Sequence, residues 1–558
     1  MSKSGDRHVV NAVQTARNNG IWLQRMEHAL GTRMFEAGAA LLEDNAERLL
    51  FQGRFELITQ LFEKIPESVV RPRWRLRLAY LWALTLTGRS KLALRLLQVI
   101  ETERRVAAIN DDLLAETRRL RVFLLSTLDR QDEAYTIVRN AMHDDNQASK
   151  FSFNVLATTI SMWKVATDAH SEAIALLNYT VDERDPSPNV FPRIQAVRLE
   201  GSVDLVQGRI RQAIANFRVA LQHASAANYA SRSTACHLAS ALYEVDELDE
   251  AKEVLSWYLQ GGCEYVQPDV TIMSNILGVR LTLASGDKDA AFLQLSEFEY
   301  LGRSSGLPRV LAAAHLERVR VALTHNDVSQ AELYYALACH PVAWSGQGKL
   351  VLPANDVECL QVSRFRLAAR KAVCDRDLRD IRSEINRARG RMRHRRALKL
   401  KILYSALLRR AGQERAALRT LSEAVSVAAG ERMVRTFVEE GPLILEMLDE
   451  LYDLRRAHQQ LDEDEVLLFL RMVLGTARKP LDDADGPGRQ VGEGVALSCR
   501  EAQVLRWVGE GLSDVDIAKA LLLAPSTVRT HLRRIYSKLG VANRVQAARQ
   551  GRRLGLFG

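Results

Sequence analysis

The sequence predicts an all-α chain in which stacked helical hairpins are followed by a small four-helix domain at the C-terminus. Three observations support this prediction. Alanines recur about every 40 residues, a turn former precedes each of them by five positions, and helix-capping residues bound four short amphipathic segments near the C-terminus. At 558 residues the chain is also too long for one compact core, so a modular or repeated architecture is expected.

The repeat is the first part of this prediction. Its alanines are spaced by 38 to 41 residues and are Ala93, Ala134, Ala173, Ala213, Ala251, Ala291 and Ala331. The matching turn formers are Gly88, Asp129, Asp168, Gly208, Asp246, Gly286 and Asn326, and Gly412 before Ala417 continues the pattern after an irregular stretch. Each unit therefore reads as helix, short turn and helix, and such hairpins bury their apolar stripes only by stacking on one another.

Composition divides the chain into an array, a linker and a terminal domain. We expect residues 1–40 to form a helical remnant or an N-terminal cap, and residues 41–474 to form the repeat array. Residues 475–495 contain Pro480, an acidic stretch and the run Gly486-Pro487-Gly488, which is typical of a flexible linker. The terminal domain then covers residues 496–558.

Positive charge is concentrated in the terminal domain. This domain holds eleven Lys and Arg residues against four acids, which is +7 of the whole chain's formal net charge of +9. Attraction for a polyanion such as double-stranded DNA is therefore expected there. A second basic run lies within residues 382–401 and contains Arg387, Arg389, Arg391, Arg393, Arg395 and Arg396. We interpret this run as a solvated helix face, with a second nucleic-acid contact or an anion pocket as the alternative.

Several other kinds of site are not expected. No nucleophile elbow or set of paired metal ligands indicates an enzyme, so no catalytic residue and no metal site are assigned. The cysteines form no C-x-x-C pair and are interpreted as reduced core thiols; they are Cys236, Cys263, Cys339, Cys359, Cys374 and Cys499. The sequence has neither a signal peptide nor an apolar run long enough to cross a membrane, which predicts a cytoplasmic protein without a membrane partner.

The terminal domain reads as four helices. Ser498 and Glu501 have the spacing of a capping box at the start of the first helix. Ser513 offers a cap for the second helix, and Pro525 suits the first position of the third, where its missing amide costs nothing. Asn543 caps the fourth helix. Apolar residues at helical spacing follow these caps, so the four helices can enclose a small core.

The third helix of this domain carries two different faces. Its inward face consists of Val528, Leu532, Ile535 and Leu539. Its outward face, which we expect to read bases in the major groove, consists of Arg529, Thr530, Arg533 and Arg534. The flanking side chains, which we expect to hold phosphates, are Ser526, Thr527, His531 and Lys538. On the fourth helix, Val545 and Ala548 lie on an apolar side that could meet a second subunit, which predicts a homodimer on DNA.

Together these positions resemble the LuxR-type helix-turn-helix domain. The resemblance places the helix-turn-helix motif at about residues 514–533 and runs through Leu497-Ser498-x-Arg500-Glu501, Gly511-Leu512-Ser513, Ile517-Ala518, Thr527-Val528-Arg529-Thr530-His531, Lys538-Leu539-Gly540-Val541 and Asn543-Arg544. It implies a DNA-binding transcription regulator. It also implies that the residues facing bases are Arg529, Thr530 and Arg533, and that those near the backbone are Thr527, His531 and Lys538. Ala524 departs from the family, which commonly has a serine cap there.

The array resembles tetratricopeptide repeats (TPR), most clearly in residues 193–224, where the face A-x-x-x-F-x-x-A consists of Ala213, Phe217 and Ala220. Residues 22–97 are similar to the segment that follows the ATPase in MalT-like regulators, through His28-Ala29-Leu30, Ala40-Leu41-Leu42, Gly53, Pro66 and Gly88-Arg89. Such regulators join a nucleotide switch, a superhelix that senses an inducer, and a LuxR-type reader. The resemblance therefore implies a small-molecule or protein effector at the array, with RNA polymerase as a candidate partner.

The nucleotide switch has no counterpart in these 558 residues, because no G-x-x-x-x-G-K-[S/T] loop occurs, and no cofactor is predicted. Either ATP-driven oligomerisation is lost in this protein, or the sequence is a truncated gene product. The alternative to a sensory regulator is a protein-interaction scaffold, whose repeats bind a partner and whose terminal domain only localises it to DNA.

Overall fold

The computed structural model describes residues 21–106, 111–141, 149–180, 190–222, 229–259, 267–347, 350–458 and 465–478, together with selected positions between 504 and 553. Helices are the only regular elements in these residues, which confirms the predicted all-α class. Among the same residues, no helix is long and apolar enough to cross a membrane.

Residues 21–31 are helical, and the array then continues mostly as pairs of helices. The α-helices of its first part are α2 (Phe35–Phe51), α3 (Phe55–Phe62), α4 (Glu67–Val70), α5 (Trp74–Leu86), α6 (Ser90–Val106), α7 (Asp111–Thr127), α8 (Gln131–Ala141), α9 (Lys150–Ala166), α10 (His170–Thr180), α11 (Val190–Val206), α12 (Ile210–Gln222), α13 (Tyr229–Glu244), α14 (Leu248–Leu259), α15 (Pro268–Ala284), α16 (Lys288–Ser305), α17 (Pro308–Thr324) and α18 (Val328–Ala338).

Three short 3₁₀ helices follow, namely η1 (Pro341–Ala343), η2 (Ser345–Gln347) and η3 (Pro353–Asn355). The later α-helices of the array are α19 (Leu360–Ala368), α20 (Asp375–Gly390), α21 (His394–Arg410), α22 (Glu414–Ala429), α23 (Arg435–Val438), α24 (Pro442–His458) and α25 (Glu465–Arg478). In the terminal domain, α29 spans Arg544–Arg553.

The predicted turn formers all occupy left-handed backbone positions. At the seven predicted sites and at Gly412, φ is positive and lies between 58° and 84°. Glycine adopts this conformation freely, and Asp and Asn tolerate it better than most other residues. The amide of Gly88 donates to the carbonyl of Thr85 at 3.2 Å, and the amide of Arg89 donates to that of Leu84 at 2.8 Å, which is a Schellman helix end. The alanines five residues after these turns are at most 1% exposed, so the predicted repeat is confirmed.

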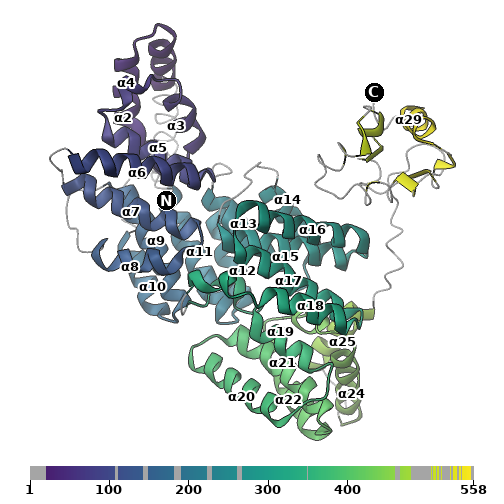
Figure 1. The fold of residues 1–558 in the computed structure, drawn as a ribbon. Helices are drawn as coiled ribbons and strands as arrows, with labels where there is room; N and C mark the ends of the chain where they lie inside the picture. Colours follow the sequence, from purple (N-terminus) through teal and green to yellow (C-terminus); the bar gives the residue numbers. More distant parts are fainter. Residues whose placement is uncertain are drawn as a thin grey trace, which may run out of the picture.

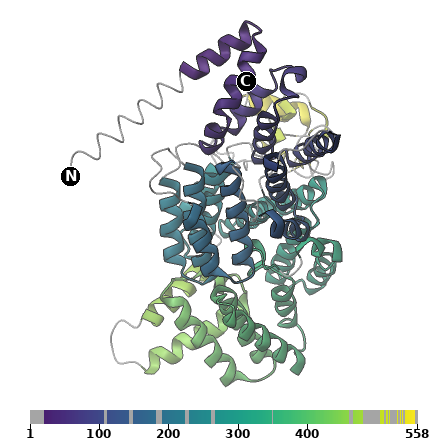
Figure 2. The ribbon, with the colours of Figure 1, turned by 90° about the vertical axis from the view of Figure 1, so that its left-hand side faces the viewer.

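Successive hairpins stack side by side into a superhelix (Figure 1). The first helices of seven hairpins form a continuous row in which each contacts the next and also its own second helix; they are α5, α7, α9, α11, α13, α15 and α17. Figure 2 shows the neighbouring helices of this row running side by side. The buried side chains of the row belong to apolar clusters that extend along the array, which confirms the predicted TPR-like superhelix.

Two helical glycines show how differently neighbouring helices can approach. A Cβ atom on Gly302 of α16 would lie 2.6 Å from the backbone nitrogen of Leu311 in α17, so the two helices touch there through their backbones. A Cβ atom on Gly278 of α15 would meet nothing within 4 Å. An alanine normally stabilises a helix interior by about 1 kcal/mol relative to glycine. At Gly278 only this helix propensity should affect stability, whereas at Gly302 the close packing of α17 opposes it.

We expect Ala substitutions at these two sites to change stability in opposite directions. Gly302→Ala should lower the free energy of unfolding by about 1–3 kcal/mol, because α16 and α17 must move apart. Gly278→Ala should raise it by about 0.5–1 kcal/mol, because the new methyl group meets no other atom. Urea unfolding of both variants measures the two changes, and a stabilised Gly302→Ala would contradict the close approach of the two helices.

Residues 339–359, which we call the crossing segment, interrupt the repeat between α18 and α19. The described residues of this segment contact the ends of earlier hairpins instead of forming another pair of helices. The amide of Val351 donates to the carbonyl of Ala166 at 3.1 Å, and the amide of Ala354 donates to Asp269 Oδ1 at 3.1 Å. The crossing segment therefore explains the irregular stretch in the spacing of alanines and turn formers.

The aspartates at three turn positions have a second role, because each binds an arginine far along the chain. The pairs are Asp129 with Arg309 at 2.7 Å, Asp168 with Arg393, and Asp246 with Arg435 at 2.6 Å. The partners are 180, 225 and 189 residues apart in sequence. We call these pairs the turn bridges, and each joins an early hairpin to a much later part of the array.

The terminal domain has its own small core. The buried apolar residues that form it, each at most 8% exposed, are Val504, Leu505, Val508, Ile517, Val528, Leu532, Ile535, Leu539 and Ala547. All four residues predicted for the inward face of the third helix belong to this set. Trp507, Leu512, Tyr536, Val541 and Ala548 pack around it.

Candidate DNA interface and buried charges of the array

One of the predicted base-reading residues lies among the described positions of the third helix. Arg533 is exposed, whereas Leu532 and Ile535 on either side of it are buried. The helix therefore presents different faces at these positions, as its 3.6-residue period requires. The other residues predicted to contact bases or phosphates lie outside the described residues; they are Ser526, Thr527, Arg529, Thr530, His531, Arg534 and Lys538.

The fourth helix, α29, is held by polar contacts. The side chain of Asn543 accepts a hydrogen bond at 3.0 Å from the amide three residues later, which confirms the predicted cap. Arg544 pairs with Asp514, at the start of the second helix, at 2.5 Å. Val545 is 63% exposed, and Ala548 is half-buried against the core of the domain. A role of these two residues in dimerisation stays a prediction.

The interpretation of the basic run as a single solvated helix face is wrong for its second half. A turn at Met392, where φ is +57°, divides the run between α20 and α21. The arginines before this turn are exposed, and they are Arg387, Arg389 and Arg391. The arginines after it have acceptors in other segments: the carboxylate of Asp356 for Arg393, Glu244 for Arg395, and the carbonyl of Asp356 for Arg396. Local charge spacing could not reveal these acceptors.

The cysteines also differ in part from the expectation of core thiols. All four described cysteines are free thiols, and Cys236 and Cys359 are buried as predicted. Cys339 and Cys374 are exposed, because both stand at helix ends, after α18 and before α20. The prediction is therefore wrong for these two residues, and the remaining two cysteines lie outside the described residues.

Buried charges gather where α15, α17, α19, α21 and the α23 region meet. This charge cluster, whose members are at most 9% exposed, consists of Arg280, Glu317, Arg320, Glu358, Arg366, Lys399, Glu439 and Glu440. Arg280 pairs with carboxylates of three different segments, at 2.8 Å from Glu317, 2.8 Å from Glu358 and 2.9 Å from Glu439. Arg366 lies between Glu358 at 2.6 Å and Glu440 at 2.8 Å. Paired in this way, the charges join helices that are distant in sequence.

Pairing keeps the carboxylates of this cluster ionised. Burial acts to raise the pKa of Glu440, but Arg366 and Lys399 outweigh it and lower this pKa to about 2. Burial also opposes ionisation of Glu358, yet Arg366 and Arg280 hold its pKa well below the ordinary value. Glu358 and Glu440 are therefore ionised at neutral pH.

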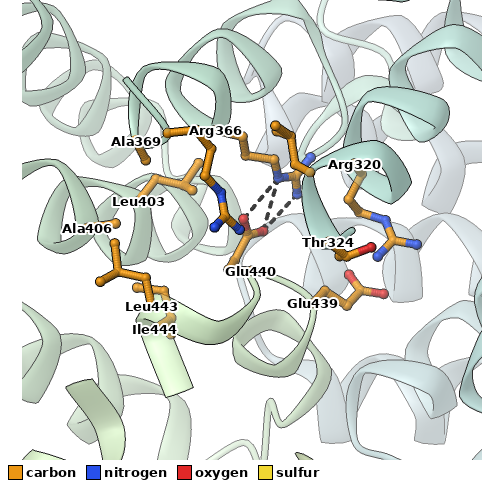
Figure 3. Close-up of a pocket in the computed structure, with 12 residues that line it drawn as sticks. Arg320, Thr324, Arg366, Ala369, Leu403, Ala406, Glu439, Glu440, Leu443 and Ile444 are labelled. Carbon is orange, nitrogen blue, oxygen red and sulfur yellow. Dashed lines mark hydrogen bonds and ion pairs between the residues drawn. The ribbon is translucent and has the colours of Figure 1, made fainter. Parts of the chain in front are cut away.

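Pockets are also found among the described residues of the array, and two of them bear on function. The first, beside the charge cluster, is formed by α17, the region of α19, α21 and the start of α24 (Figure 3), and we call it the arginine pocket. The second lies where α7, α9, α11 and the start of α15 face the crossing segment. Residues that line this second pocket include Gln131, Trp163, Gln195, Arg198, Asp269 and Leu352.

Comparison with known proteins finds relatives for both parts of the chain. The family described as MalT-like TPR region matches residues 157–454, and the family described as bacterial regulatory proteins, luxR family, matches residues 495–550. Both matched regions are regulatory domains. The second match overlaps the predicted terminal domain almost completely.

Individual relatives are more distant. Serine/threonine-protein kinase PknK of Mycobacterium tuberculosis is 26% identical over 322 residues, which are 56% of this chain and 29% of that protein. A candidate HTH-type transcriptional regulator of the same organism is 28% identical over 290 residues, which are 52% of this chain and 27% of that protein. This chain thus spans less than a third of the length of these relatives.

Among solved structures, a Rap protein complexed with Competence and Sporulation Factor matches with a TM-score of 0.42 and 12% identity, over 74% of this chain and 99% of that chain. Of the two family matches, the one to the MalT-like TPR region is the longer, and it covers more than half of the 558 residues. The chain belongs to the MalT-like family, in which it combines a MalT-like TPR region with a LuxR-family DNA-binding domain.

Proposed function

We propose that the protein is a transcription regulator that binds a specific double-stranded DNA sequence through its terminal domain. The observation that carries this proposal is the luxR-family match over residues 495–550, together with an exposed Arg533 on a helix whose other side is buried. The concentration of +7 of the net charge of +9 in this domain supports attraction to phosphates. A relative that bears the name of an HTH-type transcriptional regulator supports the same role.

Within this domain the residues have three roles. Those that contact base edges are Arg529, Thr530, Arg533 and Arg534, because arginine donates two hydrogen bonds to guanine and a threonine methyl contacts thymine. Those that hold phosphates and fix the register are Ser526, Thr527, His531 and Lys538. Val545 and Ala548 contact a second subunit, so that a homodimer binds two half-sites.

The array is the sensory part of this regulator, and a small molecule or a protein binds it as the effector. A contact between an early turn of the array and its last helix supports this role. Thr476, near the end of the last array helix α25, donates to Asp246 Oδ2 at 2.9 Å, at the turn between α13 and α14. Through this contact, a change in the packing of the hairpins would move α25, the helix that leads into the linker. The linker would then transmit this movement to the terminal domain and alter its contact with RNA polymerase.

Two substitutions in the third helix of the terminal domain test the assignment of base and phosphate contacts. Arg533→Ala should cost about 1–3 kcal/mol on the specific site and weaken the preference for one base at its position. Lys538→Ala should weaken binding to all sequences alike and reduce the slope of log K against log salt by about 1. Fluorescence anisotropy with specific and random duplexes at several salt concentrations measures both effects.

Arg376→Ala is the control for a general loss of positive charge, because Arg376 is 79% exposed on α20, in the array. It should leave both affinity and sequence preference close to those of the unaltered protein. An equal loss on specific and random DNA for Arg533→Ala would remove this residue from base readout. An absence of binding to any duplex by the unaltered chain would refute the proposed function itself.

A further inference from the structure

The arginine pocket has a polar side and an apolar side (Figure 3). Its apolar side is formed by Leu323, Ala369, Leu403, Ala406, Leu443 and Ile444. The charged residues that line it are Arg320, Arg366, Arg370, Glu439 and Glu440. A pocket of this kind suits a ligand with one charged group and a small apolar body.

Both carboxylates of the pocket already have cationic partners. Glu440 pairs with Arg366 at 2.8 Å and with Lys399 at 2.7 Å. Glu439 pairs with Arg280 at 2.9 Å. Each carboxylate is therefore already in direct contact with a cation, and Glu440 acts on a further cation in the pocket without forming an ion pair with it.

Arg370 is such a further cation. Among the residues that the structure describes, no carboxylate forms an ion pair or hydrogen bond with its half-buried guanidinium. Burial lowers the pKa of Arg370, repulsion from Arg410 adds to this effect, and attraction to Glu440 opposes it without reversing it. A Cβ atom on Gly441 would lie 2.8 Å from Arg370 Nη2, so the glycine before α24 leaves the space that the guanidinium occupies. The pocket thus holds one positive charge in excess, at a cost in solvation.

We propose that the arginine pocket binds a small organic carboxylate, whose charged group pairs with Arg370 and whose short apolar tail packs against Leu403 and Leu443. A carboxylate suits this position because a guanidinium can donate two parallel hydrogen bonds to it. Its negative charge would balance the one cation of the pocket that has no carboxylate partner. The apolar side favours an organic acid over inorganic phosphate, which would leave that surface uncovered.

This inference rests on the proposed function, since it names the chemical class of the effector that the array senses. The ligand would lie between the residues that follow α19 and the start of α24, and α24 packs on α25, the helix that leads into the linker. A bound carboxylate would therefore stabilise the contact between the hairpins before α24 and the α24–α25 pair. A ligand that favours one arrangement of these helices shifts the equilibrium toward it.

Isothermal titration calorimetry of the full chain with butyrate, in the absence of DNA, tests the site. We expect Arg370→Gln to weaken binding about 10- to 100-fold, because it removes a charge-assisted pair. Arg370→Lys keeps the charge without the parallel donors and should retain part of the affinity. Arg364→Gln is the matched control, because Arg364 lies on α19, 40% exposed, and pairs with Asp380. It should bind butyrate as the unaltered chain does.

Titrations with acetate and with inorganic phosphate distinguish the contribution of the charged group to affinity from that of the apolar tail. Butyrate should bind more tightly than either, and equal binding of phosphate would overturn the assignment to an organic acid. In the absence of ligand, Arg370→Gln should leave the Tm unchanged or raise it, because it removes an unpaired cation. A lowered Tm would instead indicate a structural arginine and contradict the proposal.

The same preparations distinguish this inference from the proposed function. No binding of butyrate to the unaltered chain, or equal binding by Arg370→Gln, would overturn the carboxylate site even if DNA binding is intact. Binding of butyrate by a chain that recognises no DNA sequence would leave the site standing and refute its role in a regulator. DNA binding by fluorescence anisotropy provides the second readout.

Discussion

Replacing Arg309 with methionine is expected to lower the free energy of unfolding by about 3–5 kcal/mol. Arg309 is fully buried and lies between two carboxylates, at 2.7 Å from Asp129 and 2.9 Å from Asp269, and it also donates to Asn355 at 2.9 Å. Methionine fills a similar volume, so the change removes the charge without leaving a large cavity. Two carboxylates would then remain in the interior without a cation.

This loss should grow with pH. Burial already raises the pKa of Asp129 above its ordinary value, Arg309 opposes this, and Asp269 adds to it. Without Arg309 the folded-state pKa rises further above the unfolded value. A raised carboxyl pKa contributes stability that is lost as pH rises through the folded value, so Arg309→Met should be closest to the unaltered protein at pH 5 and furthest from it at pH 8. Urea unfolding at both pH values measures the difference.

Two further variants complete the Arg309 test. Asp129→Asn combined with Arg309→Met should recover about 1 kcal/mol or more, since asparagine tolerates the left-handed turn and carries no charge. Arg303→Met is the matched control, because Arg303 is 62% exposed and its partner Glu299 keeps a second pair with Arg318, and it should cost less than about 0.5 kcal/mol. Equal losses for Arg303→Met and Arg309→Met, or a loss for Arg309→Met that does not depend on pH, would contradict the importance of the turn bridge.

The architecture of the array could be predicted because its signal is local. A turn residue such as Gly208 and the alanine five positions later, Ala213, determine a hairpin through backbone conformation and close packing, which involve few neighbours in sequence. Met392 shows where this fails. It takes the same left-handed conformation, with φ of +57°, although methionine is not a residue type that favours this conformation.

Contacts between distant hairpins left no comparable signal. Asp129 and Arg309 are 180 residues apart; Asp129 fits its turn and Arg309 fits its helix, so neither residue breaks its local pattern. In the terminal domain, helical periodicity correctly separated the buried Ile535 from the exposed Arg533, because a single helix contains the required information. Arg370 could not be singled out in this way, since its importance lies in the absence of a described partner, which only the fold reveals.

The charge cluster leads to a second large effect, at Glu440. The depressed pKa of Glu440, about 2 against an ordinary value of 4.5, corresponds to about 3 kcal/mol of stability. A lowered carboxyl pKa contributes stability that is present above the unfolded value and is lost as pH falls toward the folded value. Glu440→Gln should therefore destabilise the protein by about 3 kcal/mol at pH 7, or by more, because Lys399 loses the carboxylate at 2.7 Å from its Nζ.

Acid titration of stability distinguishes this electrostatic effect from a packing defect. Between pH 6 and 3.5 the unaltered protein should lose about 1 kcal/mol relative to Glu440→Gln, so that the two stability curves converge as pH falls. Glu133→Gln is the control, because Glu133 is 55% exposed and pairs with Arg130, which is 47% exposed, and it should change stability by less than about 0.5 kcal/mol. Parallel curves for Glu440→Gln and the unaltered protein would mean that the charge of Glu440 does not stabilise the array. Convergence would show that pairing by Arg366 and Lys399 more than repays the burial of this carboxylate.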